Sequence, residues 1–150
     1  MAQQFPLQVL YDLASSKLEE EARTLMELKA QWQQAEGKLR QLQGYEEEYR
    51  TRLHHSAQGG FSVSLLRDYQ TFLAKLASAV QLQESEVERC KLRWQDQYGV
   101  WQAADRQLQA YTVLQTRFQQ ERNARENRLE QKELDEWARK FFYQHQQKDH

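Results

Sequence analysis

The sequence has few residues that interrupt helices and few that form covalent links. Its 150 residues include one proline, five glycines and one cysteine. Proline and glycine are the residues that most often end helices, so their scarcity favours a chain of long helices. A lone cysteine excludes a disulfide within the chain and fits a reducing compartment such as the cytosol.

Long hydrophobic runs and an excess of one charge are also missing. No segment approaches the ~20 apolar residues that a membrane-spanning helix needs, and the polar start MAQQFPLQ is unlike a signal peptide. The 21 basic and 22 acidic residues give a net charge of -1, which provides no general attraction for nucleic acid or anionic lipid. We therefore expect a soluble, cytoplasmic protein that neither binds nucleic acid nor inserts into a membrane.

Familiar catalytic and metal-binding patterns do not occur. The chain lacks a glycine-rich phosphate loop, a Cys-x-x-Cys pair and a His-Glu-x-x-His motif. His54 and His55 are neighbours at a helix end and diverge, and Cys90 falls among packed positions. The acidic runs at 19–21 and 46–48 cannot converge on one ion, because consecutive helical residues point about 100° apart. We expect no enzymatic activity, no cofactor and no metal.

What the sequence does contain is a regular helical pattern. It has 24 glutamines and a mean hydropathy of -1.00, and its apolar residues recur at three- and four-residue steps. This spacing is typical of the narrow seam of a coiled coil, in which each helix leaves most of its circumference in water. The first series comprises Ala14, Leu18, Ala22, Leu25, Leu28, Trp32, Ala35, Leu39, Leu42, Tyr45, Tyr49 and Leu53. The second comprises Leu66, Tyr69, Leu73, Leu76, Val80, Gln83, Val87, Cys90, Trp94, Gln97, Trp101, Ala104, Leu108, Tyr111, Gln115 and Phe118.

The two series are separated by the stretch SAQGGFS at residues 56–62. Gly59 and Gly60 supply a positive φ without steric cost, and Ser62 is suited to cap the next helix. The sequence therefore predicts an all-α fold, a long antiparallel two-helix coiled-coil hairpin with an unpaired C-terminal helical extension. We expect a single coiled-coil domain at 1–150, with helices at about 7–56 and 62–146 and a turn at 57–61.

A reversal at the paired glycines also predicts the register of the hairpin. Facing residues should have numbers that add to about 119, which places Leu42 near Ala77 and residue 1 near Phe118. The regular seam ends just after Phe118, at the point where the first helix has run out. The three glutamines of the second series are expected to fix this register at some cost in stability.

Two groups of apolar residues fall outside the seam. Leu134, Trp137, Phe141 and Phe142 form a stripe near the C-terminus with no opposite helix to cover it. This stripe either docks on a partner or frays, and we expect docking because clustered exposed aromatic residues usually mark an interface. Near the turn, Tyr45, Phe72 and Ala79 lie beside the seam residues Leu42, Tyr49 and Leu76. They either widen the core locally or form a partner-binding patch.

Several segments together resemble the flagellar export protein FliJ family of bacterial type III secretion. The resemblance covers essentially the whole chain. The segments that carry it are MAQ…LQVLYDLA, QAEGKLRQLQGYEEEYRTRL, YQTFLAKLASAVQLQ, WQAADRQLQAYTVLQTR and ENRLEQKELDEWARK. Heptads alone would not identify a family, but the order of these segments is far more specific.

The resemblance implies a monomeric stalk on the cytoplasmic face of the inner membrane at the flagellar base. Such a protein inserts its helix ends into the hexameric export ATPase FliI, promotes ring assembly, reaches the cytoplasmic linker of the export gate protein FlhA and escorts export chaperones. The resemblance implies gate binding by Leu42, Tyr45, Tyr49, Phe72, Leu76 and Ala79. It implies ATPase binding by Leu10, Leu13, Leu18, Arg128, Leu134 and Trp137. The alternatives are the equivalent stalk of a virulence secretion system and a plain structural or homodimeric coiled coil.

Overall fold

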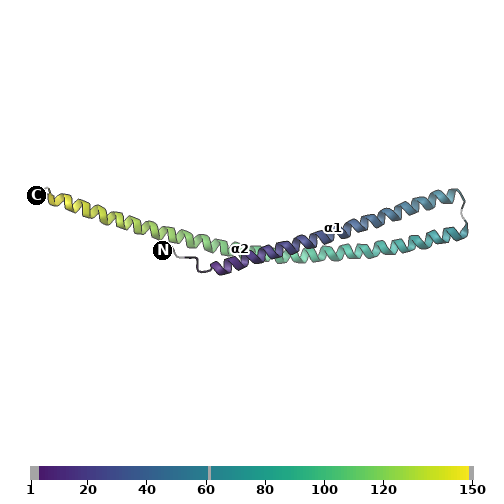
Figure 1. The fold of residues 1–150 in the computed structure, drawn as a ribbon, viewed down its shortest axis with the longest axis horizontal. Helices are drawn as coiled ribbons and strands as arrows, with labels where there is room; N and C mark the ends of the chain where they lie inside the picture. Colours follow the sequence, from purple (N-terminus) through teal and green to yellow (C-terminus); the bar gives the residue numbers. More distant parts are fainter. Residues whose placement is uncertain (1–3, 61, 149–150) are drawn as a thin grey trace. The chain divides into compact units, whose positions relative to one another are not determined.

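The computed structural model describes residues 4–60 and 62–148, and nearly all of them are helical. Helix α1 spans Gln8–Gln58 and helix α2 spans Val63–Lys148 (Figure 1). The described residues contain no strand. The two helices pack against each other in opposite directions, so the predicted all-α hairpin is confirmed.

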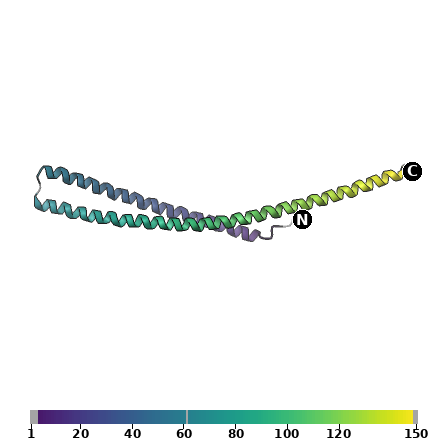
Figure 2. The same cartoon turned by 180° about the vertical axis from the view of Figure 1, so that it is seen from behind.

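The described residues fall into two compact units, and both helices contribute to each. One unit is Leu18–Ala104, and the other combines the chain up to Lys17 with the chain from Asp105 onwards. Within Leu18–Ala104 the two helices lie side by side and are joined by the short connection between Gln58 and Val63 (Figure 2). That residues 1–150 behave as a single domain stays a prediction.

The helices bury one narrow stripe of side chains each. All sixteen seam positions predicted in α2 are buried or half-buried, with Leu76, Val80, Cys90 and Ala104 among the most shielded. In α1, eleven of the twelve predicted positions are shielded, and Tyr45 is the exception. No large side chain among the described residues is completely buried, because each helix has only one neighbour to cover it.

The turn is built from local backbone and capping interactions. The Gly59 N–H donates to the Ser56 carbonyl at 3.1 Å, and Gly60 adopts a φ of 87°. Ser62 caps α2, since its Oγ accepts from the Leu65 N–H at 3.3 Å. Helix α1 thus ends two residues later than the expected Ser56. Of the expected turn, Phe61 lies outside the described residues.

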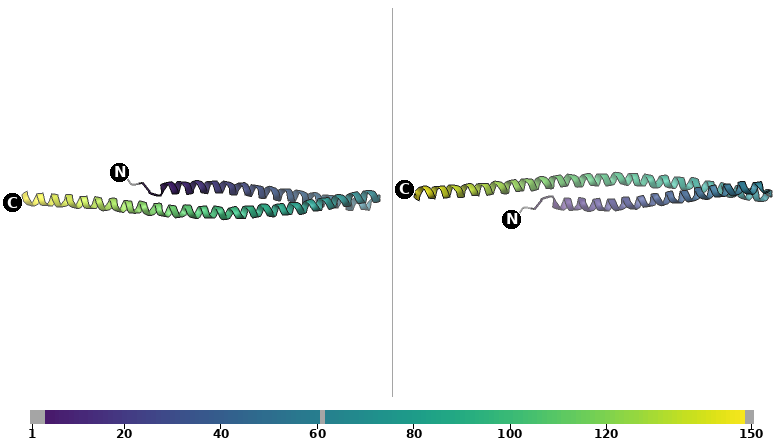
Figure 3. Two further views of the ribbon diagram at one scale, coloured as in Figure 1. Left: turned by 90° about the horizontal axis from the view of Figure 1, so that it is seen from below. Right: turned by 90° about the horizontal axis from the view of Figure 1, so that it is seen from above.

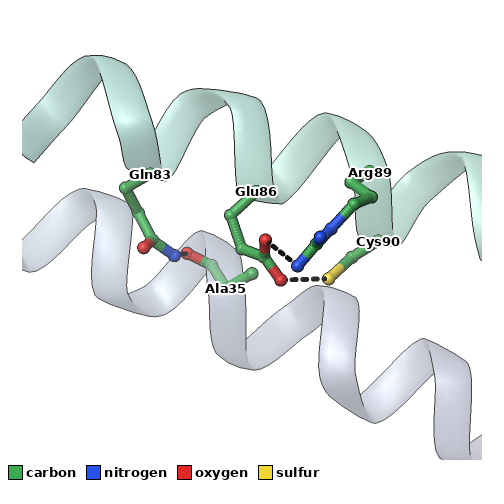
Figure 4. Close-up of polar contacts among 5 residues, drawn as sticks. All are labelled: Ala35, Gln83, Glu86, Arg89 and Cys90. Carbon is green, nitrogen blue, oxygen red and sulfur yellow. Dashed lines mark hydrogen bonds and ion pairs between the residues drawn. The ribbon is translucent and has the colours of Figure 1, made fainter.

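Two glutamines link the helices of the unit Leu18–Ala104. The Gln83 side-chain amide donates to the Ala35 carbonyl at 3.0 Å in a buried position (Figure 4). The Gln97 amide donates to the Glu21 carbonyl at 3.2 Å. In both pairs the residue numbers add to 118, one less than the predicted 119. The seam glutamines therefore contact the opposite backbone in the expected register.

In the other unit, the start of the chain lies against the part of α2 where the regular seam ends. The rings of Phe5 and Phe118 are 5.6 Å apart, and the amide of Gln115 is 3.5 Å from Gln8 Oε1. The register had placed residue 1 opposite Phe118, but Phe118 lies against Phe5, and the numbers of both pairs add to 123 where about 119 was predicted. The predicted register therefore shifts by four residues at this end, and Met1 itself lies outside the described residues.

The C-terminal part of α2 continues without a covering helix (Figure 3). Every described side chain from residue 123 onwards is exposed, so this segment matches the predicted unpaired extension. Contacts between successive turns occur within it, such as the hydrogen bond from Gln131 to Asp135 at 3.2 Å. Neither helix, over the residues described, contains a segment long and apolar enough to cross a membrane.

Candidate partner-binding surfaces

Six residues near the turn form a surface that we call the turn-proximal face. It combines residues of both helices, all within the unit Leu18–Ala104: Leu42, Tyr45, Tyr49, Phe72, Leu76 and Ala79. The rings of Tyr49 and Phe72 lie 4.7 Å apart, so the structure brings the two helices' aromatic residues together. Tyr45 is 45% and Phe72 42% exposed, whereas Leu76 is buried. Two aromatic rings of this face, those of Tyr45 and Phe72, therefore remain accessible beside the packed seam.

Glu46 explains why Tyr45 is accessible. A four-residue step from Leu42 along the seam leads to Glu46, whose side chain is only 19% exposed and pairs with Arg50 at 2.9 Å. Tyr45 is therefore turned to the side of the seam, where its hydroxyl accepts from Gln41 at 3.2 Å. Tyr45 belongs to the recurrent apolar series of α1 but lies beside the seam, as the sequence pattern placed it, and the next seam position after Leu42 is taken by Glu46.

The face continues towards the turn as a shallow depression of about 340 Å³. It is lined by Tyr49, Leu65, Asp68, Tyr69 and Phe72. The Leu65 side chain is about as exposed as Phe72. Leu65 and Asp68 were not among the predicted site residues, although Leu65 lies seven residues before Phe72 and so on the same side of α2.

A second surface, the terminal stripe, lies on the uncovered part of α2. It consists of Leu134, Trp137, Phe141 and Phe142, all of them exposed, with Leu134 at 60% and Trp137 at 64%. The rings of Trp137 and Phe141 stack with centroids 5.4 Å apart, which holds them on one side of the helix. The structure therefore shows the stripe that the sequence predicted, without a covering element among the described residues.

The other predicted ATPase-binding residues differ in their surroundings. Leu10 and Leu13 are exposed near the start of α1 and are free to contact another molecule. Leu18 is half-buried and belongs to the unit Leu18–Ala104. Arg128 is exposed, and its Nε donates to the Ala124 carbonyl at 3.4 Å.

Comparison with known proteins identifies the family. The family model described as "Flagellar FliJ protein" matches residues 3–147. The chain belongs to the FliJ family. A "Flagellar FliJ protein" of Escherichia coli (strain K12) is 32% identical over 140 residues, which cover 93% of this chain and 95% of that protein. A protein of the same name in Salmonella typhi is 31% identical over the same shares of both chains. No solved structure gives a significant match.

Membership of the FliJ family associates the chain with flagellum biogenesis and flagellar protein export. The resemblance noted in the sequence is thereby confirmed over nearly the whole chain. The matched stretch contains both the turn-proximal face and the terminal stripe, so both surfaces lie within the part of the chain that the family shares.

In this FliJ-family chain, the middle of the hairpin contains a packed aromatic group. The rings of Trp32 and Trp94 are 5.6 Å apart, and Lys29 Nζ lies 4.3 Å from the first and 5.0 Å from the second. Tyr98 stacks on Trp94 at 5.4 Å. A cation held over two indole rings stabilises the pairing of the helices. The indole N–H of Trp32 is buried and has no hydrogen-bond partner among the described residues. The spacing of apolar residues gave no signal for this role of Lys29.

The chemistry of Cys90 is that of a packed thiol. Its Sγ is buried and lies 3.6 Å from a carboxylate oxygen of Glu86, which also pairs with Arg89 (Figure 4). Burial, followed by the hydrogen bond to Glu86 and the negative charge of that carboxylate, raises the pKa of the Cys90 thiol. Within residues 4–60 and 62–148, no cluster of three or more His, Cys, Asp or Glu side chains is arranged to hold a metal ion.

Proposed function

We propose that this chain is a stalk component of the flagellar type III export apparatus that links the hexameric export ATPase FliI to the export gate protein FlhA. The observation that supports this most is the family match over residues 3–147. A hairpin with one accessible apolar face near its turn and another on its uncovered C-terminal helix has two places to hold two partners.

The turn-proximal face is the proposed contact for the cytoplasmic linker of the gate protein. Leu42, Tyr45, Tyr49, Phe72, Leu76 and Ala79 are the residues assigned to it. Accessible aromatic rings above a packed apolar base are typical of binding hot spots, and Tyr45 and Phe72 have this arrangement.

The free helix ends are the proposed contact for the ATPase ring. The residues assigned to it are Leu10, Leu13, Leu18, Arg128, Leu134 and Trp137. Leu134 and Trp137 supply exposed apolar surface, and Arg128 adds a positive charge six residues before Leu134. A ring that closes around this helix would cover side chains that water now reaches.

The mode of action that we propose is mechanical coupling without catalysis by this chain. The part of α1 from Leu18 to Gln58 rises about 60 Å at 1.5 Å per residue, which suffices to bridge two large proteins. We place the protein in the cytoplasm, against the inner membrane at the flagellar base, and propose that it promotes assembly of the ATPase ring and hands over export chaperones.

The ATPase contact is tested by adding the full-length chain to purified FliI and measuring ring formation and ATP hydrolysis. We expect both to rise. The Leu134→Ala, Trp137→Ala double variant should lose most of the effect while its helicity stays unchanged, because both side chains are exposed. Leu82→Ala, at an exposed leucine of α2 outside the proposed contacts, is the matched control. Equal stimulation by all three proteins would contradict the proposal.

The gate contact is tested with the Tyr45→Ala, Phe72→Ala double variant. We expect it to keep nearly all of its far-UV helical signal and to lose binding to the purified cytoplasmic part of FlhA. Loss of the fold in this variant would instead mean that both rings belong to the core of the hairpin. Deletion of the gene should abolish motility, which separates a flagellar stalk from that of a virulence secretion system.

A further inference from the structure

The turn-proximal face contains a groove between the two helices. Tyr49 of α1 lines one side of the depression, and Leu65 and Phe72 of α2 line the other. Leu65, Phe72 and Ala79 are seven residues apart and therefore follow one line along α2. Leu65 and Phe72 are exposed and Ala79 is half-buried, so an apolar edge about 20 Å long runs beside the seam.

The backbone around the groove determines what kind of segment can occupy it. Both walls are α-helices, whose N–H and C=O groups are paired within each helix. An extended peptide in this groove would find no backbone partners for its own N–H and C=O groups. A helix satisfies these groups internally and presents side chains at the three- and four-residue spacing that fits an edge with a seven-residue repeat. The groove therefore favours a helical occupant.

The charges beside the groove indicate which charges that helix should carry opposite them. Asp68 lines the depression and makes no ion pair among the described residues. The arginines opposite it on α1 are already engaged, Arg50 with Glu46 and Arg52 with Glu48, both at 2.9 Å. Lys75, two turns or about 10 Å further along α2, likewise makes no ion pair in the described part of the chain. A partner that covers these side chains removes water from both charges, which is costly unless it supplies opposite charges.

We propose that the turn-proximal face binds an amphipathic helix of the export gate, which packs as a third helix beside α1 and α2. In this arrangement a basic residue of the bound helix faces Asp68 and an acidic residue faces Lys75. This inference rests on the proposed gate contact of the same face. It adds the secondary structure of the bound segment and the order of its charges, and it extends the contact to Leu65 and Asp68.

The experiment uses the full-length chain and a synthetic peptide that covers the cytoplasmic linker of the gate protein. Calorimetry gives the affinity, and circular dichroism at 222 nm compares the mixture with the sum of its components. We expect a gain in helical signal on mixing, because the peptide folds on the groove. Asp68→Lys should weaken binding about three- to tenfold at low salt and less at high salt. Lys75→Glu should act in the same direction.

Glu84→Lys is the matched control, because it makes the same kind of charge reversal at an exposed position of α2 outside the face. It should change the affinity less than twofold. Binding without a gain in helicity, or equal effects of Asp68→Lys and Glu84→Lys, would overturn the inference. If the Tyr45→Ala, Phe72→Ala variant still binds as the unmodified chain does, the gate contact itself fails. If that variant loses binding but Asp68→Lys binds with unchanged affinity, the gate contact stands and only the inference of a bound third helix with these charges is contradicted.

Discussion

Among single residues, Glu46 decides which aromatic ring stays accessible near the turn. Its carboxylate takes a seam position at the cost of partial desolvation, and the ion pair with Arg50 offsets part of that cost. Tyr45 is left on the flank, where a partner can reach it.

Cys90 gives a prediction on pH. Burial, then the hydrogen bond to Glu86 and its charge, raise the pKa of the thiol in the folded chain. Folding thus favours the protonated thiol. This preference contributes fully to the free energy of unfolding below the ordinary thiol pKa, and the contribution is lost as the pH rises through the higher pKa of the folded chain. We expect iodoacetamide to modify Cys90 much more slowly at pH 8 in the folded chain than in urea, as followed by mass spectrometry.

The variant Glu86→Gln is the control for this thiol. It removes the charge that opposes the thiolate, so alkylation of the folded chain at pH 8 should become faster. Equal rates in folded and unfolded chains would show that Cys90 is not shielded.

Gln83 gives a prediction on stability. The Ala35 carbonyl keeps its helical hydrogen bond when the Gln83 amide is removed, so Gln83→Leu leaves no unpaired group behind. We expect this variant to raise the free energy of unfolding by about 1 kcal/mol in urea titrations. Ala35→Leu fills the space into which the amide reaches and should lower it by about 2 kcal/mol. A loss of stability in Gln83→Leu would mean that the amide contributes more than an apolar side chain can.

Among the elements, the connection between α1 and α2 depends on one backbone conformation. Gly60 has a φ of 87°, which side chains with a Cβ rarely adopt. Gly60→Ala should therefore lower the free energy of unfolding by about 1 kcal/mol. At Gly59 an added Cβ would meet only the Ser56 carbonyl oxygen at an ordinary 3.7 Å, so Gly59→Ala is the matched control and should be near neutral. Similar losses at both positions would contradict this account of the turn.

At the scale of the whole molecule, the chain covers its own seam. Each helix supplies the apolar stripe that the other needs, so a second copy has no seam left to fill. We expect sedimentation equilibrium to give a monomer of 18.1 kDa at micromolar concentrations. A species of twice this mass would favour the homodimeric coiled coil that the sequence left open.

The sequence by itself determined the helices, the place of the reversal, the register within Leu18–Ala104 and the uncovered stripe. These features depend on residue spacing and on glycine and serine at 59–62, and local chemistry fixes them before any packing occurs. The family, too, could be recognised from the order of segments along the chain.

Only the tertiary structure decided which side chains share each surface and how they lie relative to the seam. The shielding of Glu46 within the seam, the depression that Leu65 and Asp68 share with Tyr49, and the position of Lys29 over two indole rings all depend on the opposite helix. A periodic pattern locates an apolar stripe only to within part of a helical turn, because either of two adjacent residues can satisfy a three- or four-residue step. The final choice is made by the packing of large side chains from two helices against each other, which sequence spacing does not contain.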